Sequence, residues 1–296
     1  METILSGQLL FSALVTGSIY VLLGFGLNIV FGTMRLLNIA HGEIAMIGAY
    51  ISFSLFDLYG VSPLISMFLA MAVTSAFGAL VYRGVFRKLI ADSPTLARLE
   101  GNSLLIFLGL SIILQNCTSF FFSASPRAYR YLDDIWRIGN VAITYNRLVV
   151  LVVAIGLCAA AALFLTRHIY GLAIKAYIQN PQAAMVMGIN IDRIQLLSFC
   201  IGFASAGITG ALLSMLEQIS PFMGFSYTIA AFVVVILGGL GNLVGGMMAG
   251  FLLGVLETYG VALTSPNLQL VLIYGVFVLV LIFQPQGLTG GRRAIR

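Results

Sequence analysis

Three polar side chains, Asn38, His41 and Glu43, interrupt an apolar stretch that runs from Phe31 to Tyr50 and is long enough to lie within a bilayer. Polar and ionisable groups at membrane depth are costly, and those that occur usually face a bundle interior or a substrate pathway. On a helix, Asn38 and His41 would share one face, whereas His41 and Glu43 would point roughly 200° apart. The spacing therefore argues against an acid-base pair and predicts a polar wall of a pathway or gate.

A structural role is the alternative for these residues. Glu43 could pair with Arg35 near a membrane edge, and His41 could cap broken backbone. If the apolar run begins at Leu36, helical rise places Glu43 only about 10 Å from that edge, which is shallow enough for partial hydration.

The composition requires a helical membrane protein. The chain has 296 residues, of which 60% are hydrophobic and 8% charged, whereas soluble domains carry about 25% charged residues. Successive apolar runs approach the roughly 20 residues that a spanning helix needs. We expect an all-α, polytopic helical bundle that occupies residues 1–296 as one domain, surrounded by membrane lipid.

About nine crossings are predicted, or eight if one short segment is broken or re-entrant. The runs are Gln8–Val30, Leu36–Phe56, Pro63–Tyr82, Ser103–Phe122, Arg147–Thr166, Ile194–Glu217, Gly224–Leu237, Leu243–Ala262 and Leu268–Phe283. The net charge of +5 lies in short connections, which is typical of topology signals and does not indicate nucleic-acid binding. The basic loops Arg83–Gly101 and Arg167–Arg193 and three C-terminal arginines favour the cytoplasm, and Ser123–Asn146 the outside.

Small residues recur every fourth position in two of these runs, a spacing that lets helix backbones touch. They are Ser198, Gly202, Ala206, Gly210 and Ser214 in one run, and Gly246, Gly250 and Gly254 in the other. Asn242 opens the second run much as Asn38 opens an earlier one. Since transporters often place their pathway between such repeats, Asn242 is a further candidate for the pathway, with chance similarity as the alternative.

The segment from Gly32 to Gly48, with NIAHGE at Asn38–Glu43, resembles the signature of permeases from bacterial branched-chain amino-acid ABC importers. The resemblance continues in order through RHIYGLAIKAYIQNPQAAMVMGINIDRI, SPFMGFSYTIAAFVVVILGGLGNLVGGMMAGFLLGVLE and QPQGL. It implies an inner-membrane permease that pairs with a related second permease or a second copy, two cytoplasmic ATPase subunits and an extracytoplasmic substrate-binding protein. The implied substrates are branched-chain or other small apolar amino acids, with urea or short amides as alternatives.

No catalytic role is expected for the chain itself. Neither Lys88 nor Lys175 ends a phosphate-binding G-x-x-x-x-G-K-[ST] loop, so ATP hydrolysis would need a partner subunit. Cys117, Cys158 and Cys200 lie in apolar runs without metal-ligand spacing. We therefore expect neither metal nor cofactor, and an ion-coupled carrier or channel remains the alternative class.

The cytoplasmic segment Gly171–Ile191, which includes Lys175, contains a predicted short helix. Asn180 can cap its start and Pro181 fits its first turn. Ala183, Ala184 and Met187 would fall on or near one apolar face, and Gly188 could end the helix. The family resemblance implies that this face docks on the ATPase, and a helix lying on the membrane surface is the alternative.

Overall fold

The computed structural model describes residues 7–138, 141–265, 268–283 and 287, which form a helical bundle with one small hairpin. The helices are α1 (Gly7–Met34), α2 (His41–Tyr59), α3 (Pro63–Val81), the π-helix η1 (Tyr82–Phe86), α4 (Arg87–Asp92), α5 (Leu96–Phe122), α6 (Tyr145–Arg167), α7 (Ile169–Gln179), α8 (Pro181–Val186), α9 (Ile191–Leu213), α10 (Met223–Gly238), α11 (Leu243–Leu263) and α12 (Gln269–Phe283). Strands β1 (Ile135–Ile138) and β2 (Val141–Thr144) pair antiparallel within the predicted external connection.

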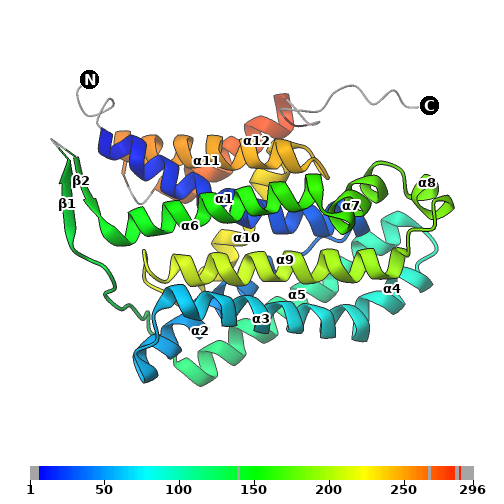
Figure 1. The fold of residues 1–296 in the computed structure, drawn as a ribbon, viewed down its shortest axis with the longest axis horizontal. Coiled ribbons are helices and arrows are strands. Elements are labelled where there is room, and N and C mark those ends of the chain that lie inside the picture. Colours follow the sequence, from blue (N-terminus) through cyan, green and yellow to red (C-terminus); the bar gives the residue numbers. More distant parts are fainter. Residues whose placement is uncertain (1–6, 139–140, 266–267, 284–286, 288–296) are drawn as a thin grey trace.

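Most long helices run along the long axis of the molecule, with the β1–β2 hairpin at one end and α7 and α8 at the other (Figure 1). We call these the hairpin end and the α8 end. Within the described residues, six segments are long and apolar enough to cross a membrane: α1, α3 with its extension to Asp92, α5, α6, α9 and α11. The apolar helix α10 and the apolar part of α12 are shorter. The predicted polytopic helical bundle is confirmed.

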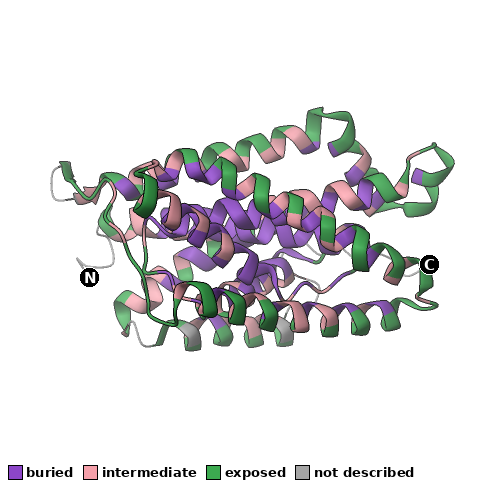
Figure 2. Cartoon of the chain, turned by 90° about the horizontal axis from the view of Figure 1, so that it is seen from below, coloured by how far each residue is buried: buried purple, intermediate pink, exposed green. Residues whose placement is uncertain are grey.

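Buried residues gather in the interior of the bundle (Figure 2), and helix α1 contributes many of them. In its most apolar 18-residue window 89% of residues are buried, compared with 72% in α9 and 17% in α5. An outer helix such as α5 therefore turns apolar side chains away from the protein. Such exposure is unfavourable in water but suits a helix that contacts lipid.

Glycines allow the central helices to approach closely. A Cβ added at Gly254 of α11 would lie 2.3 Å from the backbone nitrogen of Gly17 in α1, and one at Gly210 of α9 would lie 1.7 Å from the carbonyl oxygen of Ala45 in α2. No side chain fits at such distances, so the paired backbones are in contact. Gly202, Gly246 and Gly250 also lie at close approaches, and Ala206 is fully buried.

The connection between α1 and α2 differs from the expectation. The sequence pattern placed a break at Phe31–Arg35 and a helix from Leu36, but α1 continues to Met34 and α2 begins only at His41. Arg35 has a positive φ of 57°, and residues 36–38 are non-helical. Asn38 is therefore not on the helix of His41, and the prediction that they share a helical face is wrong.

Candidate functional site

The first turn of α2 lies at mid-length in the bundle. The His41 Nε2 atom is 3.0 Å from the carbonyl oxygen of Leu23, near the middle of α1. The Glu43 Oε1 atom accepts a long hydrogen bond, 3.4 Å, from the hydroxyl of Ser111, near the middle of α5. The expectation of a shallow Glu43 is wrong because residues 35–40 are mostly non-helical, and extended chain covers about 3.3 Å per residue, compared with about 1.5 Å in a helix.

Helix α10 begins directly against this first turn of α2. The Gly42 N–H donates to the Thr228 hydroxyl at 2.8 Å, and that hydroxyl donates to the Ile39 carbonyl at 2.9 Å. A Cβ on Gly42 would lie only 1.8 Å from the carbonyl oxygen of Gly224. Two helix starts thus meet inside the bundle, and the positive ends of their helix dipoles lie close together there.

Several buried polar atoms at this junction have no hydrogen-bond partner among the described residues. They are both amide atoms of Asn38, Nδ1 of His41 and Oε2 of Glu43. The three side chains are at most 1% exposed, and leaving such groups unsatisfied costs free energy. Each of these atoms, an amide, an imidazole nitrogen and a carboxylate oxygen, could form a hydrogen bond with a polar partner.

The structural alternative for Glu43 is not observed. Arg35 is exposed, and its guanidinium lies 5.4 Å from the centre of the Phe31 ring. In the described part of the chain the two ion pairs are Arg87–Asp192 and Arg130–Asp133. Glu43 is therefore held through Ser111 and not through Arg35.

Asn242 occupies the corresponding break between α10 and α11, where it caps a helix. Its Oδ1 atom accepts from the Gly245 N–H at 3.1 Å. Asn28 of α1 donates from Nδ2 to the Asn242 carbonyl at 2.8 Å and accepts from the Gly241 N–H at 2.8 Å. Asn28 was missed by the sequence analysis, although a lone amide in an apolar run is the kind of signal that could have singled it out. A pathway role for Asn242 stays a prediction.

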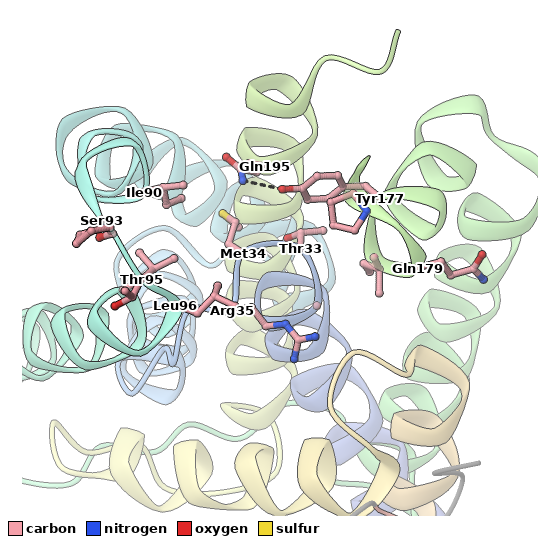
Figure 3. A pocket seen from close by; sticks show the side chains of 15 residues that line it. Thr33, Met34, Arg35, Ile90, Ser93, Thr95, Leu96, Tyr177, Gln179 and Gln195 are labelled. Carbon is pink, nitrogen blue, oxygen red and sulfur yellow. Dashed lines mark hydrogen bonds between the residues drawn. The ribbon is translucent and has the colours of Figure 1, made fainter. Parts of the chain in front are cut away.

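A cavity of about 530 Å³, the α8-end cavity, opens between the α4–α5 connection and α7, beside the end of α1 (Figure 3). Its polar lining comes from Thr33, Arg35, Ser93, Thr95, Tyr177, Gln179 and Gln195. Gln195 donates from Nε2 to the Tyr177 hydroxyl at 3.1 Å. Burial raises the pKa of Tyr177, so this phenol stays protonated at physiological pH.

The predicted coupling segment has the expected start but not the expected exposed face. Asn180 accepts from the Ala183 N–H at 3.0 Å, and Pro181 is the first residue of α8. Gly188 has a φ of 80°. Ala184, however, is only 3% exposed and Met187 is 81% exposed, so they do not share an exposed face.

Ala184 belongs to a buried cluster with Ile174, Tyr177 and Ile194, which come from α7 and α9. The most exposed apolar side chains here are instead Met185, Val186 and Met187. Elsewhere in the predicted coupling loop, Gly171 packs against the carbonyl of Phe164 and Lys175 is half-buried.

A second cavity, the hairpin-end cavity, has a volume of about 450 Å³ and contains both acidic and basic side chains. Glu217, Glu257 and Arg147 line it. Tyr20 donates a short hydrogen bond to Glu257, and Gln269 donates to the same carboxylate at 2.5 Å. No local sequence pattern predicts this grouping, because its residues come from distant parts of the chain.

The membrane-length helices, the broken helix starts and the buried polar groups define an integral membrane protein of the multi-pass, transporter-like class. A solved structure described as PsaBC from Streptococcus pneumoniae in complex with Fab has the same general fold. Its TM-score is 0.50 at 10% identity, and the match covers 96% of this chain and 95% of that one.

The family follows from the sequence comparisons. Residues 9–281 match the family model described as "Branched-chain amino acid transport system / permease component", and the chain belongs to this family. It is 32% identical to the high-affinity branched-chain amino acid transport system permease protein BraD of Pseudomonas aeruginosa, over 96% of this chain and 95% of that protein. LivH of Escherichia coli is 30% identical with the same coverage, and LivM of that organism is 27% identical over 91% of this chain and 67% of LivM.

Proposed function

We propose that the chain is the integral-membrane permease subunit of an ABC importer and forms the translocation path for branched-chain or other small apolar amino acids. One observation carries the assignment of the path: the partnerless polar atoms of Asn38, His41 and Glu43 lie at mid-length in the bundle. The names of its relatives favour branched-chain amino acids over urea or short amides.

The permease works with other subunits in this proposal. They are a related second permease or a second copy, two cytoplasmic ATPases and an extracytoplasmic substrate-binding protein. Similarity to both LivH and LivM, two permease proteins named for the same transport system, supports a pair of related permeases. Because neither Lys88 nor Lys175 ends a phosphate-binding loop, the ATPases supply the energy. The chain forms one domain, multi-pass in the inner membrane with a cytoplasmic C-terminus.

Reconstitution tests this assignment. Vesicles that contain the complete importer should accumulate leucine only when ATP and the binding protein are present. The purified permease alone should hydrolyse ATP no faster than empty vesicles. Leucine accumulation driven by a sodium or proton gradient without ATP would contradict the proposal and favour an ion-coupled carrier.

Glu43→Gln tests the mid-length site within this importer. The substitution keeps the shape of the side chain but removes the charge, so we expect normal assembly with leucine uptake reduced at least about 10-fold, the equivalent of about 1.4 kcal/mol. Asp57→Asn is the matched control, since Asp57 is an exposed carboxylate on the same helix. Unchanged leucine uptake by a correctly assembled Glu43→Gln importer would show that the charge of Glu43 has no essential role in the translocation path.

A further inference from the structure

The hairpin-end cavity is formed by segments that are far apart in the chain. Its lining comes from the start of α1, the start of α6, the α9–α10 connection, α11 and the start of α12. Four helices and one connection therefore have to be in place before the polar side chains meet. Such a cavity can be selective in a way that a surface cluster of charges cannot.

Two carboxylates on one side of the cavity are held by neutral donors. Glu257 is 6% exposed and receives hydrogen bonds from Tyr20 of α1 and Gln269 of α12. Glu217 is exposed and receives a hydrogen bond of 2.7 Å from Tyr227 of α10. These donors fix the positions of the carboxylates but add no positive charge.

Arg147 supplies the opposite charge. It lies in the first turn of α6, where the positive end of the helix dipole disfavours a cation. Its Nη1 atom donates to the Ser12 hydroxyl at 3.2 Å, and in the described part of the chain it forms no ion pair with either glutamate. An unfavourably placed guanidinium and two carboxylates thus line one cavity without neutralising one another.

The rest of the lining contains apolar as well as uncharged polar residues, and the apolar ones offer a surface for an aliphatic group. It includes Leu9, Val15, Leu216, Val261 and Ala262. A ligand that suits the whole cavity carries a cation, an anion and an apolar group on one small frame. An α-amino acid with an aliphatic side chain has these three features, and a volume of about 450 Å³ accommodates it.

We propose that the hairpin-end cavity binds a zwitterionic aliphatic α-amino acid, with its ammonium at Glu217 and Glu257 and its carboxylate at Arg147. The inference rests on the proposed function and adds to it a second site, since Asn38, His41 and Glu43 do not line this cavity. Charge-assisted hydrogen bonds at both ends of the ligand give the site its selectivity. A molecule that lacks one of the two charges binds more weakly.

Cysteine protection measures occupancy of the cavity directly. The probe is Ala262→Cys, because Ala262 lines the cavity and is exposed. It is introduced into the complete importer after Cys117, Cys158 and Cys200 have been replaced by alanine. Labelling by a membrane-impermeant thiol reagent is then timed without binding protein, in the presence of leucine, leucinamide or 4-methyl-2-hydroxypentanoate. The leucine concentration that slows labelling should be at least about 10-fold lower than the concentration of either analogue that has the same effect.

Two variants assign the two charges. Arg147→Gln should weaken protection by leucine about 10-fold but leave protection by leucinamide, which has no carboxylate, unchanged. Glu217→Gln should weaken protection by leucine. It should leave protection by 4-methyl-2-hydroxypentanoate, which has no ammonium, unchanged. Asp134→Asn and Arg137→Gln are controls that change exposed charges at the same end of the molecule. They should not alter protection by any of the three compounds. A general distortion of the fold would not give this crossed pattern.

The outcomes separate the two proposals. If the importer takes up leucine but leucine does not slow labelling, or if all three compounds protect equally, the binding site is rejected and the permease function stands. If the crossed pattern is found but the complete importer shows no ATP-dependent uptake, the binding site stands and the permease function is rejected.

Discussion

At the scale of single residues, Gly42 has no room for a side chain. An added Cβ would lie 1.8 Å from the Gly224 carbonyl oxygen and 2.6 Å from the Thr228 hydroxyl. Gly42→Ala must therefore separate α2 from α10, and overpacking of this kind costs about 1–3 kcal/mol or more. We expect a lower melting temperature and a lower yield of monodisperse protein in detergent.

Gly109→Ala in α5 is the control for this substitution, since nothing lies within 4 Å of its added Cβ. Alanine has the higher helix propensity, so the control should be neutral or slightly stabilising. Equal melting temperatures for both variants would show that the contact between Gly42 and α10 is not tight in the folded protein.

Sequence reasoning at this scale identified side chains better than their surroundings. Asn38, His41 and Glu43 stand out because polar groups in an apolar run are costly wherever the chain places them. Their depth depends on the non-helical residues 36–38, which are held partly by a hydrogen bond from the Leu37 N–H to Ser103 of α5. That contact joins distant segments, so no local pattern could predict it.

At the scale of the elements, helix α8 has one feature that the local sequence determines and one that tertiary packing determines. Its start at Asn180 and Pro181 was predictable because capping is local. Its buried face was not, because α7 and α9 cover Ala184, which leaves Val186 and Met187 87% and 81% exposed. The exposed end of α8, and not Ala184, is therefore the surface available to an ATPase.

Three glutamate substitutions test this surface. Met187→Glu should insert and fold normally but lose most of the co-purifying ATPase, because burying an unpaired charge at an interface costs several kcal/mol. Ala184→Glu should instead lower the stability of the permease itself. Ala91→Glu, at an exposed position of α4, is the control and should change neither. Wild-type ATPase association in the Met187→Glu protein would contradict docking through this surface. It would favour the alternative, in which α8 lies on the membrane surface.

Helix α1 contacts all three polar sites at the scale of the whole molecule. It contributes Ser12 and Thr16 to the hairpin-end cavity, the Leu23 carbonyl to His41, and Thr33 and Met34 to the α8-end cavity. Helix α1 is also the most buried of the long helices. A movement of this helix would therefore change the geometry of each site. Its approach to α11 through Gly17 and Gly254 leaves no space for side chains between them.

The distribution of charge predicts how the molecule sits in the membrane. Basic residues near the α8 end are Arg35, Arg83, Arg87, Lys88, Arg98, Arg167, Lys175 and Arg193. At the hairpin end, arginines are accompanied by Asp133 and Asp134. The positive-inside rule counts mainly basic residues in short loops, which favours a cytoplasmic α8 end. The three C-terminal arginines, used for the same prediction, lie outside the described residues.

Single cysteines at exposed positions test this orientation. Ser125 lies at the hairpin end beyond α5, and Gln182 lies in α8. In a chain without its native cysteines, Ser125→Cys should react with an impermeant reagent in spheroplasts, whereas Gln182→Cys should react only after the membrane is permeabilised. This orientation also places Val186 and Met187 where an ATPase can reach them, and the cavity of Glu217, Glu257 and Arg147 where external amino acids arrive. Labelling of Gln182→Cys in sealed spheroplasts would show that the α8 end faces outward. It would contradict both the proposed ATPase contact and the proposed access of external amino acids to the cavity.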